Sequence, residues 1–372
     1  MLKHTILVIG AGKIGTTVAG LLSNTDDYKV FLGDLNKPNN LPNIKNNPIE
    51  FVQTNIEAYE EIKNFIKTNN VEAIISCLPF HLTLKVAKIA HECGIHYFDP
   101  TEDVAITEQV TLLAQDSKGV FAPQCGLAPG FISIAANSLM EDMNEIEHVK
   151  MRVGALSQST SNSLHYAFTW SIDGVINEYI NPCEVIENGK KHITPALGGL
   201  EKLIINDCHF EAFHTSGGVG SLADTYKGKV KNLDYKTIRY PGHCNKMAFL
   251  LQDLKLKNDP ELVKNIISKV VPYIEQDKVV VYVSVEGYKN GKLYENIYSN
   301  TLYPINIGEQ NYTAIQMTTA SGICTVVDMV MKENKLNNNN GIIKQEQIAL
   351  KDFLANRFGS YYAQGENNAF IK

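Results

Sequence analysis

Three glycines near the start of the chain form the motif with the clearest chemical meaning, Gly10-Ala11-Gly12-Lys13-Ile14-Gly15. They follow the apolar segment 5–9 and open a helical pattern with apolar residues at 14, 18, 21 and 22. Gly10 permits a tight turn, Gly12 lets the backbone approach a pyrophosphate, and Gly15 lets the helix pack closely on the strand. Because the first amides of a helix attract phosphates, the motif predicts a dinucleotide site made by Gly10, Gly12, Lys13, Ile14 and Gly15. The structural alternative is a glycine-rich packing turn.

An acidic residue, Asp34, closes the next apolar segment, 30–33, and lies 19 residues after Gly15. Its carboxylate can accept hydrogen bonds from both hydroxyls of an adenosine ribose, and it would repel a 2′-phosphate. No Arg follows Asp34 directly to bind such a phosphate. The sequence therefore predicts NAD as the cofactor in preference to NADP.

Further candidate site residues follow the other predicted strands of the first half. Asn55 comes after the third strand, and the turn Cys77, Leu78, Pro79 comes after the fourth, so these four residues are expected to border the cofactor. Segments 99–103 and 125–130 follow the fifth and sixth strands. Because ligands of doubly wound sheets bind at the carboxyl ends of the strands, both segments are expected to face the nicotinamide.

The second half of the chain carries polar, glycine-rich segments that a plain sheet does not need. Segment 213–221 contains His214, Thr215 and Ser216, and segment 237–243 places Arg239 and His243 beside a Pro-Gly turn. Trp170 is the only tryptophan. An arginine can bind a carboxylate as a bidentate pair, so these residues could line a substrate pocket. The structural alternatives are a hairpin turn, a surface arginine and a core tryptophan.

The elements that position these residues alternate between strand and helix up to about residue 124. Segments 71–78 and 119–122 are almost wholly apolar, as expected of strands buried on both faces. The pattern predicts an α/β fold with a doubly wound parallel sheet. The predicted strands are 5–9, 30–33, 49–52, 71–78, 94–98 and 119–122, and the predicted helices are about 14–22, 59–67 and 82–93.

After about residue 147 the pattern changes to alternating apolar and polar segments, which favours a mostly antiparallel sheet with flanking helices. Strands are predicted at 148–153, 279–285, 293–299 and 312–317. Asn290-Gly291 predicts a hairpin, because both turn positions need a positive φ. Helices are predicted from about residue 319 and at 345–357. The expected domains are thus 1–124 for the dinucleotide, an inserted α+β domain at 125–318, and C-terminal helices at 319–372 that pack back on the first domain.

Composition argues against several classes of protein. The chain has 372 residues and a net charge of −6, with no basic stripe for nucleic acid. No apolar stretch was found that approaches the length of a membrane span, and the N-terminus leaves no room for a signal peptide, so we expect a cytoplasmic protein. The seven cysteines are scattered along the sequence without close pairs, which is typical of proteins in a reducing compartment. His91, Cys93 and His96 lack a second ligand pair, and no metal is predicted.

Taken together, several motifs resemble the saccharopine dehydrogenase family over about residues 3–330. Within that family the chain is similar to the lysine 6-dehydrogenase and glutamate-forming saccharopine dehydrogenase branch. The motifs beyond the glycine turn are more specific than the turn itself. They are Tyr97-Phe98-Asp99, Cys125-Gly126-Leu127-Ala128-Pro129-Gly130, Thr169-Trp170-Ser171 with Gly174 and Glu178-Tyr179, Phe213 to Gly218, and Lys236-Thr237-Ile238-Arg239-Tyr240 with Gly242-His243.

The resemblance implies a Rossmann domain with an inserted substrate and dimerisation domain, a homodimer, and NAD(P)-dependent oxidation of a carbon–nitrogen bond in a lysine-derived amino acid. It also implies that Asp99 and Cys125 lie near the reacting carbon and that Trp170 and Arg239 line the substrate pocket. We expect Asp99 to organise proton transfer, with His214 and His243 as reserve acid–base candidates. We expect no covalent role for Cys125, because hydrolysis of an imine needs no thioester.

Several alternatives remain at this stage. Within the family, the chain could deaminate lysine at its side-chain amine or act as a carboxynorspermidine dehydrogenase-like polyamine enzyme. A semialdehyde dehydrogenase would need a histidine that activates Cys125 and an acyl-phosphate site, and the sequence supports neither. Sugar dehydrogenases with a Glu-Lys-Pro segment are disfavoured by Asp99-Pro100-Thr101. From another class, a non-enzymatic NAD-binding regulator would keep the glycine turn but lose the polar pocket residues.

Overall fold

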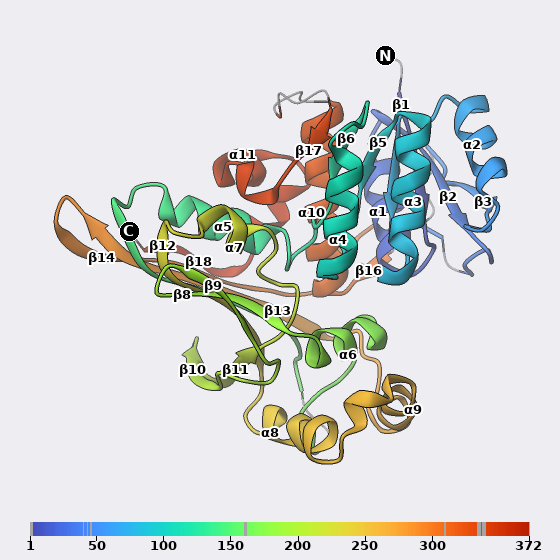
Figure 1. Cartoon of the computed structure of the whole chain (residues 1–372). Coiled ribbons are helices and arrows are strands. Elements are labelled where there is room, and N and C mark those ends of the chain that lie inside the picture. Colours follow the sequence, from blue (N-terminus) through green and yellow to red (C-terminus); the bar gives the residue numbers. More distant parts are fainter. Residues whose placement is uncertain are drawn as a thin grey trace. The chain divides into compact units, whose positions relative to one another are not determined.

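The computed structural model describes residues 3–39, 41, 42, 44, 47–159, 162–308, 310–332, 336 and 340–371. The chain forms two compact units, Met1–Phe131 with Gln316–Ala363, and Ile132–Ile315 with Gln364–Lys372 (Figure 1). The first unit extends to Phe131 rather than to residue 124, because the Phe131 ring stacks on Tyr362 with ring centroids 3.9 Å apart.

The first unit is built on a seven-stranded sheet in the order β17-β6-β5-β4-β1-β2-β3. Every neighbouring pair is parallel. This confirms the predicted doubly wound sheet, in which the chain reverses direction beside β1. The strands are β1 (His4–Ile9), β2 (Tyr28–Asp34), β3 (Glu50–Gln53), β4 (Ala73–Ser76), β5 (His96–Phe98), β6 (Val120–Ala122) and β17 (Gly341–Ile342).

Helices cover both faces of this sheet. The crossover through α1 leads from β1 to β2, and the crossover through α3 leads from β4 to β5 in the opposite direction along the sheet. Because both crossovers are right-handed, α1 and α3 lie on opposite faces. Leu7 and Ile9 accordingly share one apolar core with α2, α3 and α4. The helices are α1 (Lys13–Ser23), α2 (Tyr59–Thr68), α3 (Phe80–Cys93) and α4 (Val104–Ala114).

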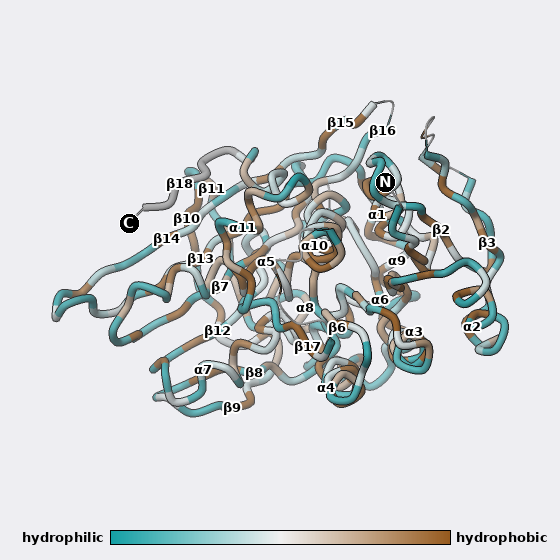
Figure 2. Tube along the Cα trace, turned by 90° about the horizontal axis from the view of Figure 1, so that it is seen from above, coloured by the Kyte–Doolittle hydropathy of each residue, from teal (hydrophilic) through white to brown (hydrophobic). Residues whose placement is uncertain are grey.

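The helix α10 (Ala314–Met331) differs from the sequence predictions in where it begins and in its long apolar stretch. It starts where a strand was predicted, because both carboxylate oxygens of the buried Asp277 accept hydrogen bonds from its first amides, those of Ala314 and Ile315, at 2.6 and 2.9 Å. Its 18 residues have a mean hydropathy of 1.3, so by length and composition alone it could cross a membrane. However, 78 % of that stretch is buried inside the fold, as expected of a core helix (Figure 2).

The C-terminal segment of the first unit is held by a buried polar network around Asp328 of α10. Asp328 accepts hydrogen bonds from Tyr28 at 2.6 Å and from Asn356 at 2.8 Å, and it pairs with Arg357 at 2.6 Å. The helix predicted at 345–357 is shorter than expected. It consists of η3 (Gln345–Gln347) and α11 (Leu350–Ala355), followed by η4 (Gly359–Ala363).

The second unit is built on a nine-stranded mixed sheet. Its main order is β10-β11-β12-β7-β13-β14-β18, and β8 pairs with both β12 and β9. Only β12 and β7 run parallel. The strands are β7 (Glu145–Ser157), β8 (Cys183–Glu187), β9 (Lys190–Thr194), β10 (Glu201–Ile205), β11 (Cys208–His214), β12 (Val230–Arg239), β13 (Asp277–Lys289), β14 (Lys292–Leu302) and β18 (Glu366–Ile371).

Two details of the second unit bear on the predicted domains. The hairpin between β13 and β14 is confirmed, with positive φ at Asn290 and Gly291. β18 pairs with β14, so residues 366–371 form a strand of the second unit rather than a helix on the first. The unit also contains α5 (Phe131–Met140), α6 (Ile172–Ile180), α7 (Leu222–Tyr226), α8 (His243–Ala248), η1 (Phe249–Asp253), η2 (Leu256–Asn258), α9 (Pro260–Val270) and the pair β15 (Ile305–Ile307) and β16 (Gln310–Tyr312).

Candidate active site

The glycine turn between β1 and α1 brings three backbone segments into very close contact. A Cβ at Gly15 would lie 1.7 Å from the carbonyl oxygen of Gly10. A Cβ at Gly10, which has a φ of +105°, would lie 2.6 Å from the carbonyl oxygen of Cys77 at the end of β4. No side chain fits at either position, so both glycines are required for α1 to pack on the strands.

Gly12 has a different environment from its two neighbours in the motif. It is the N-cap residue of α1, and a Cβ there would meet no atom within 4 Å. The space beside the helix N-terminus is therefore open, as a pyrophosphate needs. The turn fits a dinucleotide because Gly12 is open to a ligand, whereas Gly10 and Gly15 are packed against the backbone.

Asp34 lies at the end of β2, directly beside the turn. Its Oδ2 accepts a hydrogen bond from the amide of Ala11 at 2.7 Å, and its Oδ1 accepts one from Asn36 at 3.2 Å. The structure thus places a half-buried carboxylate next to the backbone where a dinucleotide would lie.

The four remaining cofactor candidates border the same end of the sheet. The amide of Cys77 donates to the carbonyl of Ile9 at 2.7 Å, Leu78 packs against the core, and Pro79 caps α3. Burial raises the pKa of the Cys77 thiol to about 12, so it stays protonated at neutral pH. Asn55 accepts a hydrogen bond from the amide of Glu57 at 3.0 Å and borders a cavity of about 210 Å³ beside α2.

Asp99 and Cys125 lie in contact at the ends of β5 and β6. The thiol and the amide of Cys125 both donate to the carbonyl oxygen of Asp99, at 3.2 and 2.9 Å. Oδ1 of Asp99 accepts a hydrogen bond from Thr101 at 2.7 Å, whereas Oδ2 is buried without a hydrogen-bond partner. Asp99 and Cys125 therefore lie together at the carboxyl ends of neighbouring strands.

Burial determines the protonation states of the Asp99 carboxyl group and the Cys125 thiol. Asp99 is fully buried, which raises its pKa to about 6, although Tyr97 and the amides of Thr101 and Gln124 partly offset the rise. Burial and the nearby Asp99 raise the pKa of the Cys125 thiol well above its usual value. Asp99 can thus exchange a proton near neutral pH, while Cys125 lacks the thiolate that a nucleophile needs.

In the second unit, Arg239 lies at the end of β12 in a cage of aromatic side chains. Its side chain is 2 % exposed, and its guanidinium lies 5.0 Å from the ring centre of Tyr166 and 5.8 Å from that of Tyr179. Its Nε donates to the hydroxyl of Tyr179 at 2.9 Å. Within the part of the chain that the structure describes, no carboxylate lies within 4 Å of this charge.

His243 belongs to the same cluster but is held as a neutral group. Its Nδ1 donates to the carbonyl of Leu164 at 2.8 Å, and its Nε2 lies 3.1 Å from the hydroxyl of Tyr179. Burial and the Arg239 charge lower the pKa of His243 to about 3. His243 therefore orients Tyr179 instead of exchanging a proton with substrate at neutral pH. The tyrosines 166 and 179 were missed as cage residues, although Tyr179 belongs to one of the quoted motifs.

The other predicted substrate residues are not brought to Arg239. In the register of β11 and β12, His214 lies opposite Lys236, and both side chains project from the same face of the sheet. Arg239 lies three residues after Lys236 and projects from the opposite face. Thr215 bonds to Thr237 at 2.7 Å, and Ser216 bonds to the carbonyl of Pro182 at 2.9 Å. Trp170 is half-buried against the apolar core that contains Tyr166 and Tyr179.

Metal ligands were also considered. Among the residues that the structure describes, no group of three or more His, Cys, Asp or Glu side chains could hold a metal ion. His91 lies 2.9 Å from Asp116, and His96 accepts a hydrogen bond from the amide of Val120 at 2.9 Å. These two histidines therefore have structural partners.

Comparison with known proteins identifies the family. The model of the saccharopine dehydrogenase NADP binding domain matches residues 6–122, and that of the saccharopine dehydrogenase C-terminal domain matches residues 126–359. The chain belongs to the saccharopine dehydrogenase family. The predicted family membership and the predicted class, an NAD(P)-binding oxidoreductase, are thus confirmed.

Curated relatives are similar over part of this saccharopine dehydrogenase family chain. The mitochondrial alpha-aminoadipic semialdehyde synthase of Mus musculus is 24 % identical over 210 residues, which are 54 % of this chain and 22 % of that protein. The same enzyme of Bos taurus is 25 % identical over 209 residues, with the same coverage. The chain spans about a fifth of the length of these relatives.

Solved structures of low identity share the fold. The glutamate-forming saccharopine dehydrogenase of Saccharomyces cerevisiae superposes with a TM-score of 0.72 at 12 % identity, covering 94 % of this chain and 97 % of that one. An engineered D-amino acid dehydrogenase bound to NADP+ superposes with a TM-score of 0.52 at 11 % identity, covering 98 % and 99 %.

The glycines of the turn generate a paired prediction. Gly12→Ala should leave the melting temperature unchanged but weaken NAD binding at least about tenfold, because the new methyl group enters only the open space of the phosphate site. Gly15→Ala should lower the free energy of unfolding by at least about 2 kcal/mol, because its methyl group overlaps Gly10. Calorimetric titration with NAD and thermal unfolding measure the two effects. Equal NAD affinity of Gly12→Ala and the wild type would contradict the assigned site.

The raised pKa of Asp99 generates a second prediction, about stability. The pKa rises from 3.8 to about 6 on folding, so the buried group favours folding only while it is protonated. Between about pH 4 and 7 the wild type should lose on the order of 3 kcal/mol relative to Asp99→Asn. Urea unfolding at each pH measures the difference, with Asp26→Asn, at an exposed position, as the control. A difference that does not change with pH would contradict the assignment.

Proposed function

We propose that the protein oxidises a carbon–nitrogen bond of a lysine-derived amino acid of the saccharopine type, with NAD as hydride acceptor. The observation that carries the proposal is the buried guanidinium of Arg239, which has no carboxylate partner within 4 Å among the described residues. The buried Glu178 interacts with this charge electrostatically, but no described carboxylate pairs with the guanidinium directly, so an anionic ligand can still bind it there. The α-carboxylate of an amino acid supplies that anion in a bidentate pair.

We assign the proton transfer to a residue of the first unit. A bound nicotinamide cofactor would supply the hydride acceptor, and the glycine turn together with Asp34 would hold it. The nitrogen of the substrate must first give up its ammonium proton, and the Oδ2 atom of Asp99 is buried without a partner and belongs to a carboxyl group with a pKa of about 6. We assign to this carboxylate the acceptance of that proton and its return to the leaving amine after water has attacked the imine. Cys125 is assigned a packing role, because its thiol donates to the carbonyl of Asp99.

For the cofactor we propose NAD, on the strength of Asp34. The name of the matching family domain and that of one similar structure both refer to NADP. Against this, the Asp34 carboxylate bonds to the amide of Ala11, at the position where a 2′-phosphate would have to be accommodated. We further propose that the protein is a homodimer, as its resemblance to the family implies, and that it is located in the cytoplasm, because its seven cysteines show no paired spacing.

Arg239→Met tests the assignment of the substrate site. We expect kcat/KM for saccharopine to fall at least about 100-fold with NAD affinity unchanged, because the substrate carboxylate loses its partner. The melting temperature should fall, since the change removes the cation that interacts with the buried Glu178, and retained NAD affinity then shows that the variant is folded. NADH absorbance with saccharopine, lysine and a carboxypolyamine in parallel identifies the substrate, and Lys202→Met, at an exposed position, is the control. Full activity of Arg239→Met would contradict the proposal.

Asp34→Ser tests the choice of cofactor. The wild type should turn over NAD at least about tenfold more efficiently than NADP, because the Asp34 carboxylate repels a 2′-phosphate. The variant should lose most of that preference, since serine carries no charge. Steady-state rates with both nucleotides measure the ratio for each protein. A wild type that prefers NADP would show that the carboxylate does not select the cofactor.

A further inference from the structure

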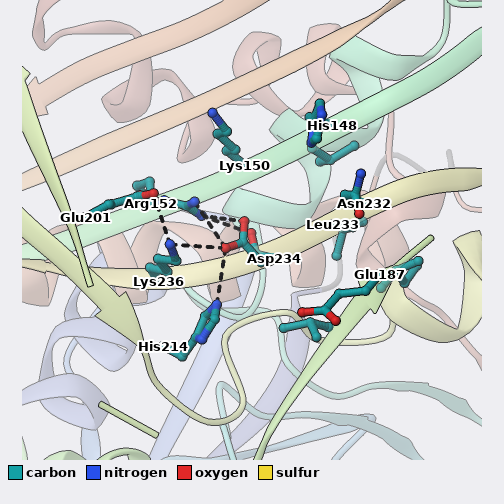
Figure 3. Close-up of a pocket in the computed structure, with 13 residues that line it drawn as sticks. His148, Lys150, Arg152, Glu187, Glu201, His214, Asn232, Leu233, Asp234 and Lys236 are labelled. Carbon is teal, nitrogen blue, oxygen red and sulfur yellow. Dashed lines mark hydrogen bonds and ion pairs between the residues drawn. The ribbon is translucent and has the colours of Figure 1, made fainter. Parts of the chain in front are cut away.

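A second polar cavity lies on the face of the large sheet opposite to Arg239. It has a volume of about 290 Å³ and is lined by residues of β7, β8, β10, β11 and β12 (Figure 3). The faces are set by the alternation along β12, where Asn232, Asp234 and Lys236 project to one side and Arg239 to the other. The cavity is thus separate from the site assigned to the substrate, and its argument does not depend on the proposed reaction.

A network of paired charges forms one side of the cavity. Arg152, which is 1 % exposed, binds both carboxylate oxygens of Asp234, at 2.9 and 3.2 Å, and also pairs with Glu201. Lys236 bonds to Glu201 at 2.9 Å, and His214 lies 3.2 Å from Asp234 (Figure 3). The two cations and two carboxylates balance one another, so this part of the lining is rigid and satisfied.

The rest of the lining carries acidic and basic side chains that the network leaves unpaired. His148 and Lys150 lie on β7, beside Asn232 and Asp234 of β12. Glu187 lies on β8, and the register Leu233↔Ile186 places it opposite Asn232. Among the described residues, none of these three has an ion-pair or hydrogen-bond partner for its side chain. Figure 3 shows the two basic residues on one side of Asn232 and Glu187 on the other.

The two basic residues therefore lie on one side of β12, and the acidic residue Glu187 lies on the other side. Two strand spacings, about 9.6 Å, separate the backbones of β7 and β8. The long side chains of Lys150 and Glu187 can span most of this distance and meet a ligand above β12. Lys150 and Glu187 are exposed at the cavity, where water also reaches them. A simple anion would pair with the bases alone, whereas a ligand that carries both charges is complementary to all three side chains.

We propose that this cavity is a second binding site, for a free α-amino acid. The carboxylate of the ligand pairs with Lys150 and His148, and its ammonium group pairs with Glu187. The volume lies near the lower limit of ordinary small-molecule sites, about 300 Å³, which suits an amino acid rather than a nucleotide.

The test measures binding to the full-length protein in an Arg239→Met background, which removes the first site from the titration. We expect L-lysine or L-glutamate to bind with a stoichiometry of one per chain. Lys150→Met and Glu187→Gln should each raise the dissociation constant about tenfold or more, because each removes one charged partner. Acetate and butylamine, each with one of the two charges, should bind at least about tenfold more weakly than either amino acid.

Matched controls separate the site from general effects of charge. Lys202→Met and Glu295→Gln remove exposed charges of the same sheet that do not line the cavity, and they should leave the affinity unchanged. Thermal unfolding should show equal stability of all variants, since the removed charges are unpaired. Two results overturn the proposal. One is the absence of saturable binding of either amino acid, and the other is unchanged affinity in Glu187→Gln with acetate binding equally well, which marks a site for anions only.

The outcome is distinguishable from failure of the proposed function. Loss of turnover in Arg239→Met with retained amino-acid binding supports both assignments. Full turnover in Arg239→Met contradicts the assigned substrate site, yet the effects of Lys150→Met and Glu187→Gln on binding still decide the second site.

Discussion

The first unit depends on the contact between the backbones of α1, β1 and β4 at the glycine turn. Because Gly10 and Gly15 carry no side chain, the carbonyl of Gly10 lies where a Cβ of Gly15 would be, and the end of β4 closes over Gly10. This contact fixes the direction of α1, and with it the position of its first amides. Gly12 stays open at the same point, and Asp34 is tied to the amide of Ala11. A dinucleotide site thus follows from packing that tolerates no larger residue.

In the second unit, the alternation of side chains along β12 places two different polar groups on opposite faces of the sheet. Along β12, Arg239 faces aromatic side chains, whereas Asp234 and Lys236 belong to a balanced network on the other face. The aromatic cage lowers the cost of burying the guanidinium, because ring faces attract cations. The buried Glu178 also interacts with this charge, whereas the other face carries direct ion pairs beside a cavity.

The sequence predicted the first unit better than the second, for a physical reason. Its strands and helices alternate, and each is specified by its own apolar pattern, so strands such as 30–33 were found from nearby residues alone. In the second unit, the Asn290-Gly291 hairpin was likewise found from nearby residues. The strand predicted at 312–317 was wrong, because Asp277, distant in sequence, binds the first amides of α10. The strands β8 to β11 were also not predicted, and β18 was expected to be helical. Their pairing depends on partners far away in the chain.

By itself, the sequence determined the doubly wound sheet, the glycine turn and the acidic residue beside it, because these features are local and have few alternatives. It also placed Asp99 and Cys125 at neighbouring strand ends. Only the tertiary structure decided their charge, since burial raises the pKa of both groups. It likewise decided that His243 is neutral, that His214 lies on the other face from Arg239, and that Arg239 is buried without a directly paired carboxylate among the described residues. These properties depend on desolvation and on contacts between distant residues, which no local pattern specifies.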